Sequence, residues 1–304
     1  MARSKSGRHD NDMHRGKSHS FKDFVETQLR DLQSRFGMAM WFLARYRDDD
    51  WLLLNSFGEG YDLERGDLLR WRDTLCYQRV RERGPLICTD VSREPAYRDA
   101  PVTDQLGIGA YLGLPLTDHR GRLFGTLCAL DPKPRPELDQ DGAREALLRQ
   151  AHLLETALVW NLAGLDQQRI AEFFEEESRD PDTDLLDMTG WGRILDQERE
   201  RCRDYGLSAV VLRVHGDNLN PDDRAEVADS LAALIRHQDM AAYLGHDQFA
   251  VLLTENTPCR AEQVRERLLD ALNAKGLLMR CEYEPLRTTP GLVQPEVLLN
   301  GAVH

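Results

Sequence analysis

The chain has 304 residues, of which 41% are hydrophobic and 30% are charged, and this length predicts two domains that each bury a core. A formal net charge of −13 argues against nucleic acid as the partner, because phosphate backbones attract basic surfaces. No apolar run approaches the roughly 20 residues of a membrane helix, and residues 1–20 are polar and basic without the apolar centre of a signal peptide, so we expect a cytoplasmic protein with a disordered tail at 1–20.

The first part of the chain predicts an α+β domain over residues 21–136. Apolar residues recur at helical spacing first, and alternating or continuous apolar runs bounded by turn residues follow. The expected elements are a helix (21–36), two strands (38–46, 51–57), a helix (68–83), a strand (85–88) and a hairpin (111–116, 123–130). This order indicates an antiparallel sheet with covering helices.

A long helix is predicted after the proline-rich run 131–136. Residues 137–177 contain no proline, and apolar side chains recur three or four positions apart. A helix of about 40 residues would span roughly 60 Å. We expect a connector helix over 137–178 that either packs on its own domain or, as we favour, joins two copies as a coiled-coil homodimer. The apolar stripe consists of Leu147, Leu148, Ala151, Leu154, Leu158, Leu162 and Leu165.

The second part of the chain predicts an α/β domain over residues 179–284. The expected elements are a helix (189–205), a strand (208–214), a helix (222–237), two strands (240–244, 248–253), a helix (260–274) and a strand (276–283). Residues 285–304 contain three prolines and are expected to form an irregular tail.

Residues 111–135, YLGLPLTDHRGRLFGTLCALDPKPR, resemble the C-terminal hairpin of GAF domains, and WRDTLC and PLICTDV stand upstream at the spacing of that family. The resemblance implies a sensor domain whose sheet and covering helices form a cup for a small ligand or for none. Trp71, Cys76, Tyr111 and Cys128 would line that cup, or they would simply be core residues, as cysteines and aromatics often are. The sequence does not identify a ligand.

Residues 236–253, RHQDMAAYLGHDQFAVLL, resemble the signature of GGDEF domains: an Arg-x-x-Asp, a spacer of five residues, the pentapeptide and an apolar strand. The run RDPDTDLLDMTGWGRIL at 179–195 resembles the opening of the same domain. The resemblance implies a diguanylate-cyclase-like fold. Active members join two GTP molecules into cyclic di-GMP with two Mg²⁺ ions held by carboxylates.

The carboxylates that this chemistry needs are largely missing. Arg213 stands where a strand carboxylate should hold the metals, and Gln248 replaces the second acid of the pentapeptide, so that Asp247 alone remains as a vestige. Magnesium requires hard oxygen ligands, and a guanidinium repels it. The six cysteines also lack zinc spacing. We therefore expect a pseudoenzyme with no catalytic residues, no metal site and no cofactor.

The pair Arg236 and Asp239 occupies the position at which active cyclases bind cyclic di-GMP for inhibition. An arginine fork suits a guanine edge or a phosphate oxygen, and a carboxylate can accept from guanine N–H groups. However, Arg-x-x-Asp occurs eight times in this chain, so the pair could equally be an ion pair at a helix end.

The resemblances together imply a non-catalytic signalling protein of the cyclic di-GMP system. Its GAF sensor would be coupled to a pseudo-cyclase that binds cyclic di-GMP or a protein partner. Two alternatives stay open: an active or weakly active diguanylate cyclase that converts two GTP to cyclic di-GMP, and a dimerisation scaffold that binds no nucleotide.

Overall fold

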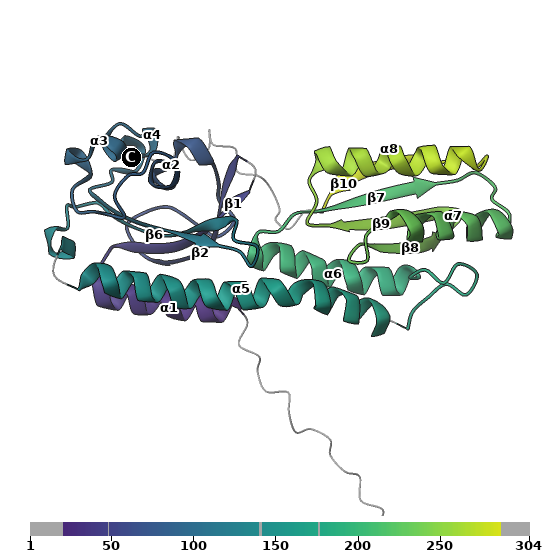
Figure 1. Cartoon of the computed structure of the whole chain (residues 1–304), viewed down its shortest axis with the longest axis horizontal. Coiled ribbons are helices and arrows are strands. Elements are labelled where there is room, and N and C mark those ends of the chain that lie inside the picture. Colours follow the sequence, from purple (N-terminus) through teal and green to yellow (C-terminus); the bar gives the residue numbers. More distant parts are fainter. Residues whose placement is uncertain (1–20, 48, 140–141, 176, 287–304) are drawn as a thin grey trace, which may run out of the picture.

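The computed structural model describes residues 21–47, 49–139, 142–175 and 177–286; the predicted tail at 1–20 and nearly all of that at 285–304 lie outside these ranges. The chain forms two α/β units side by side, each with an antiparallel sheet covered by helices on both faces (Figure 1). In the ranges described, no helix has both the length and the apolar character to cross a bilayer.

The first unit is built on a six-stranded sheet of order β3-β2-β1-β6-β5-β4. Helices α2 to α4 cover one face. The other face is covered by α1 and by the long helix that follows the last strand of this sheet in the chain (Figure 1). The elements are α1 (Phe21–Phe36), β1 (Met40–Arg47), β2 (Asp50–Gly58), β3 (Leu68–Arg70), η1 (Trp71–Asp73), α2 (Leu75–Arg81), β4 (Ile87–Cys88), η2 (Val91–Arg93), α3 (Pro95–Arg98), α4 (Pro101–Leu106), β5 (Ala110–Thr117), β6 (Leu123–Asp131) and η3 (Pro136–Asp139). The predicted α+β architecture is confirmed.

The predicted helix over 68–83 is wrong in its first half. Residues 68–70 form β3, which pairs with 50–52 at the start of β2, so tertiary pairing overrides the local preference. The helix proper begins after Thr74, whose side chain accepts a hydrogen bond from Tyr77 N. The short helices α3 and α4 were not predicted, although each begins with a proline in its first turn.

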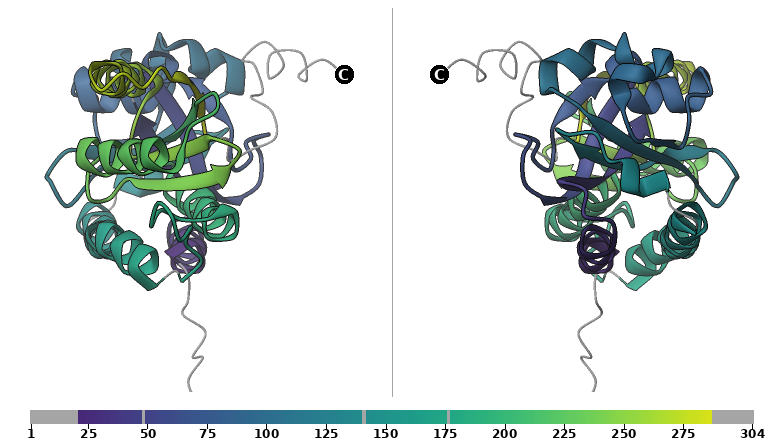
Figure 2. Two further views of the ribbon diagram at one scale, coloured as in Figure 1. Left: turned by 90° about the vertical axis from the view of Figure 1, so that its right-hand side faces the viewer. Right: turned by 90° about the vertical axis from the view of Figure 1, so that its left-hand side faces the viewer.

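Helices α1, α5 (Ala143–Glu175) and α6 (Met188–Tyr205) form one layer beneath both sheets, as the end views in Figure 2 show. A single apolar core joins this layer to a face of each sheet. The predicted connector begins later than expected, because 136–139 form a short 3₁₀ turn.

The apolar stripe predicted on the connector packs within the chain. Six of its seven members are buried, and Leu148 is exposed. The stripe therefore covers the protein's own sheets, and it was wrong to expect this face at a coiled-coil seam. A different set of large apolar side chains on α5 is exposed: Leu153 at 55%, Trp160 at 77% and Phe174 at 76%.

The second unit is a four-stranded sheet of order β10-β7-β9-β8, with α6 on one face and α7 and α8 on the other (Figure 1). Its remaining elements are β7 (Ala209–His215), α7 (Pro221–Leu234), β8 (Met240–Gly245), β9 (Gln248–Thr254), α8 (Pro258–Ala274) and β10 (Arg280–Pro285). Helix α7 ends three residues before the predicted 237 because Ile235 adopts an extended conformation.

The two units contact each other around the C-terminal end of α6. The ring of Tyr205 stacks on that of Phe21 at 5.0 Å between centroids. Arg65, from the β2–β3 connection, pairs with Asp204 at 2.8 Å, and Arg47 on β1 donates to the carbonyl oxygen of Leu207 at 3.2 Å. A change in the first sheet therefore has direct contacts through which it reaches the second unit.

A buried ion cluster joins α5 to α6. Arg169 is fully buried and donates two hydrogen bonds, of 2.8 and 3.0 Å, to Glu198, which is 1% exposed. Asp166 at 2.8 Å and Glu255 at 3.4 Å also contact this guanidinium. Burial alone would lower the pKa of Arg169, but these carboxylates, Glu198 above all, outweigh it and raise the pKa.

Candidate functional site

The structure brings Cys76, Tyr111 and Cys128 together on the face of the first sheet beneath α2 to α4. The two sulfur atoms lie 3.1 Å apart, and the Tyr111 hydroxyl lies 3.7 Å from Cys128 Sγ. Trp71 belongs to the same core cluster but packs on Tyr46 at 4.8 Å between ring centroids. All four predicted cup residues are buried, so their side chains fill the space between sheet and helices.

Three further buried aromatic residues belong to this cluster and were missed from the sequence: Phe42, Trp51 and Tyr97. Tyr97, on α3, meets the ring of Tyr111 edge-on at 5.0 Å and donates to the carbonyl oxygen of Pro85 at 2.5 Å. Trp51, on β2, meets Phe42 edge-on at 5.5 Å. The acid-proline start of α3 at Glu94 was the signal that could have placed Tyr97.

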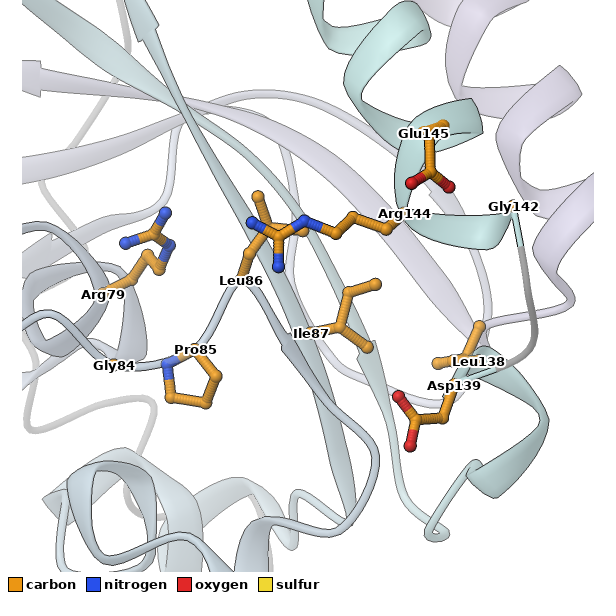
Figure 3. Close-up of a pocket in the computed structure, with 10 residues that line it drawn as sticks. All are labelled: Arg79, Gly84, Pro85, Leu86, Ile87, Leu138, Asp139, Gly142, Arg144 and Glu145. Carbon is orange, nitrogen blue, oxygen red and sulfur yellow. The ribbon is translucent and has the colours of Figure 1, made fainter.

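A separate cavity of about 460 Å³ opens beside the edge strand β4, away from the predicted cup. Figure 3 shows side chains of both charges around it: Arg79 and Arg144 on one hand, Asp139 and Glu145 on the other. The Nε atom of Arg79 is buried and has no hydrogen-bond partner among the described residues. Nothing in the sequence reasoning pointed to this cavity.

The pentapeptide forms the turn between β8 and β9. His246 and Asp247 occupy the two central positions with φ of 51° and 56°, as a type I′ turn requires. Neither is a glycine, so the left-handed conformation must be held by contacts. Asp247 supplies them: its carboxylate accepts from Leu219 N at 2.9 Å and from Arg224 Nε at 2.8 Å. Pairing with Arg224 lowers the pKa of Asp247.

Arg213 and Gln248 do not join Asp247 in a common site. Arg213 lies on the sheet face that carries Val211, and it donates to Glu284 of β10 at 2.8 Å. Arg224 comes from α7, which covers the opposite face. The side chain of Gln248 is exposed. Across the residues that the structure describes, no group of three or more His, Cys, Asp or Glu side chains is placed to hold a metal ion.

The predicted Arg236 and Asp239 pair lies in the tight turn between α7 and β8. Asp239 is buried, and its oxygens accept from Arg236 N and Nε at 3.2 and 3.1 Å and from Thr254 N at 3.0 Å. Arg236 is half exposed and also donates to the carbonyl oxygen of Thr254. Asp239 therefore ties the turn to β9, while the guanidinium reaches the surface.

Comparison with known proteins identifies a family for the first part of the chain. The family model of the GAF domain matches residues 21–158, which include the first half of α5. A curated cyclic di-GMP phosphodiesterase of Pseudomonas aeruginosa is 24% identical over 236 residues, which are 73% of this chain. The matched region corresponds to 37% of the length of that relative.

Solved structures similar to this chain include GAF domains and GGDEF domains. The GAF domain of an Acinetobacter phosphoenolpyruvate-protein phosphotransferase is 15% identical, with a TM-score of 0.38, over 47% of this chain and 85% of its own. The GGDEF domain of DgcB from Caulobacter crescentus, solved in complex with c-di-GMP, is 11% identical, with a TM-score of 0.35, over 38% of this chain and 80% of its own. The GAF family model thus covers residues 21–158, and the solved structures similar to the chain include both GAF and GGDEF domains.

Proposed function

We propose that this chain is a non-catalytic signalling protein of the cyclic di-GMP system, in which the GAF domain senses and the second unit binds cyclic di-GMP or a protein partner without making a product. The GAF match and the likeness of the second unit's signature to GGDEF domains support the class of system.

The observation that carries the non-catalytic reading is the environment of Asp247. Its carboxylate, the one acid left in the pentapeptide, is already paired with the guanidinium of Arg224 at 2.8 Å. The guanidinium of Arg224 therefore occupies the place that a metal ion bound by Asp247 would need. The strand position that would supply a second acid holds Arg213, which pairs with Glu284 on the other face of the sheet, so neither position offers magnesium a free carboxylate.

The surface group that we assign to cyclic di-GMP is Arg236. Its side chain is half exposed, and the hydrogen bond from Arg236 Nε to the buried carboxylate of Asp239 fixes the orientation of the guanidinium. An oriented arginine loses little conformational freedom on binding a guanine edge or a phosphate. Because Asp239 is occupied by Thr254 N as well, we assign it a positioning role for Arg236.

We further propose a homodimer through the exposed side of α5. Leu153, Trp160 and Phe174 are separated by seven and fourteen residues, which places them on one line of a helix in a heptad repeat. Three large apolar side chains with half or more of their surface in water form a stripe that a second copy, carrying the same stripe, would cover.

Isothermal titration calorimetry of the purified chain with cyclic di-GMP, and a product assay with GTP and Mg²⁺, test the nucleotide proposal. We expect binding heat with cyclic di-GMP, loss of that heat in Arg236→Ala, and no product from GTP. Arg70→Ala is the matched control, because Arg70 is an exposed arginine of another Arg-x-x-Asp and should leave binding unchanged. Product from GTP would instead establish an active cyclase. Neither binding heat nor product would favour the dimerisation scaffold that binds no nucleotide.

A further inference from the structure

Cys76 and Cys128 form a contact between sulfur atoms inside the GAF domain. Cys76 lies in the first turn of α2, Cys128 lies in the middle of β6, and the sulfur atoms are 3.1 Å apart. Both residues are free thiols and almost fully buried. A disulfide has a sulfur–sulfur distance of about 2.05 Å, so closing the bond requires the sulfur atoms to approach by roughly 1 Å.

Polar groups converge on the two sulfur atoms from three strands. Tyr111 on β5 places its hydroxyl 3.7 Å from Cys128 Sγ. Trp51 on β2 and Thr126 on β6 place further polar side chains near Cys76. Within the described residues, Trp51 Nε1 and Thr126 Oγ1 are buried and have no hydrogen-bond partner, which is a costly arrangement.

These groups make the two thiols unequal. Burial raises the pKa of the Cys76 thiol, but hydrogen bonds from Cys128, Thr126, Tyr111 and Trp51 outweigh burial and lower it below its ordinary value. Burial raises the pKa of Cys128 and of Tyr111. Of the two thiols, Cys76 is therefore the one that ionises more readily, and the thiolate is the nucleophilic form.

We propose that Cys76 and Cys128 are a redox pair, which a hydroperoxide oxidises to a disulfide inside the GAF domain. The sulfur of Cys76 attacks one peroxide oxygen; an S–O bond forms, the O–O bond breaks, and the leaving oxygen takes a proton to become water or an alcohol. Cys128 Sγ then attacks the sulfenic sulfur of Cys76, and hydroxide leaves as water with the proton of Cys128. The two thiols lose two electrons, and the peroxide gains them.

The pair also differs from another buried cysteine of the chain. Cys202, on α6, faces the carboxylate of Glu198 at 3.9 Å, and burial raises its pKa to about 12. A thiol in that setting remains protonated and inert. Cys202 is therefore a matched control of equal burial but different surroundings.

The test uses the full chain in a Cys259→Ser background, which removes the exposed thiol of α8. After treatment with hydrogen peroxide, denaturing alkylation and mass spectrometry should reveal one peptide pair linked through Cys76 and Cys128, which dithiothreitol separates. Cys202→Ser should leave the linkage intact. In Cys128→Ser, Cys76 should stop at the sulfenic acid, which dimedone traps.

The proposal is overturned if the unsubstituted pair stays reduced under peroxide while the protein keeps its native circular dichroism, or if Cys76 is oxidised without forming the linkage. Should Cys128→Ser fail to fold, the linkage in the unsubstituted pair decides the question by itself. The readout concerns thiols of the GAF domain only, so it does not depend on whether the second unit binds cyclic di-GMP.

Discussion

Replacing Arg169 by methionine tests whether the layer of α5 and α6 ties the two units into one folded body. Arg169 is fully buried, and its partner Glu198 is 1% exposed, so neither charge can turn to water when the other is removed. The substitution deletes two charge-assisted hydrogen bonds to Glu198, each worth about 1.5–3 kcal/mol, together with those to Asp166 and Glu255, and it leaves the buried carboxylate of Glu198 without its main partner.

The expected loss follows from these contacts. Breaking a buried pair by removing one partner costs about 3–5 kcal/mol. Arg201 remains 3.4 Å from Glu198 and takes up part of the stranded charge, so we expect the lower end, about 3 kcal/mol. That is a large share of the ~5–15 kcal/mol by which folded proteins are stable.

Urea unfolding followed by tryptophan fluorescence measures the effect. The control is Arg199→Met on α6, because Arg199 is 46% exposed and pairs with an exposed Asp196, and such pairs contribute about 1 kcal/mol or less. The double variant Arg169→Met, Glu198→Leu should recover most of the loss, since it also removes the buried carboxylate and leaves only the partly exposed Asp166 and Glu255 without this arginine. If Arg169→Met is as mild as Arg199→Met, or the double variant no better than the single one, the buried pair does not tie α5 to α6.

Three further outcomes are expected. Trp160→Asp should convert the dimer to a monomer in light scattering, whereas Leu278→Asp, at a similarly exposed apolar position outside α5, should not. A monomeric unsubstituted protein would contradict the proposed dimer interface on α5. Asp247→Ala should lower the free energy of thermal unfolding by about 1–3 kcal/mol and Asp247→Asn by less, because asparagine keeps an acceptor for Leu219 N; unchanged melting would refute this. The rate of disulfide formation by peroxide should increase as pH rises through about 7, where Cys76 ionises, and a rate independent of pH would count against Cys76 as the attacking group. Thr74→Ala should also increase this rate, because it removes the side-chain cap at the start of α2.

Much of the fold could be predicted because the strongest signals were local and periodic. The hairpins of the first sheet and helix α1 lie where alternation and helical spacing placed them, and α1 has the predicted bounds, 21–36. The errors arose where distant contacts decide the structure. Residues 68–70 look helical alone but become a strand because β2 offers an edge.

The connector illustrates a limit of reading periodicity. The apolar stripe with Leu154 and Leu158 was visible in the sequence, but nothing local distinguishes a stripe that covers a sheet from one that meets another chain. The wider spacing of Leu153, Trp160 and Phe174 is a weaker pattern, and only the folded structure identifies it as the exposed one.

The shared location of the four predicted cup residues was predictable, but their individual contacts were not. Trp71, Cys76, Tyr111 and Cys128 do lie in one core cluster, because the hairpin and α2 have a recognisable order. The contact between the sulfur atoms of Cys76 and Cys128 depends on how α2 packs on β6. No local sequence pattern determines that packing. Likewise, the partner of Asp247 is Arg224, 23 residues earlier, and no spacing rule links them.

The continuous helical layer also determines how this protein can be divided. Expression of residues 179–284 alone would leave α6 without α5 and α1, and would expose to solvent the ring face that Tyr205 now presses against Phe21. A fragment with such an uncovered apolar surface tends to aggregate. The junction in the sequence near 178 is thus a poor place to cut, and fragments meant to isolate the second half should retain α5 and α1 or be paired with them in trans.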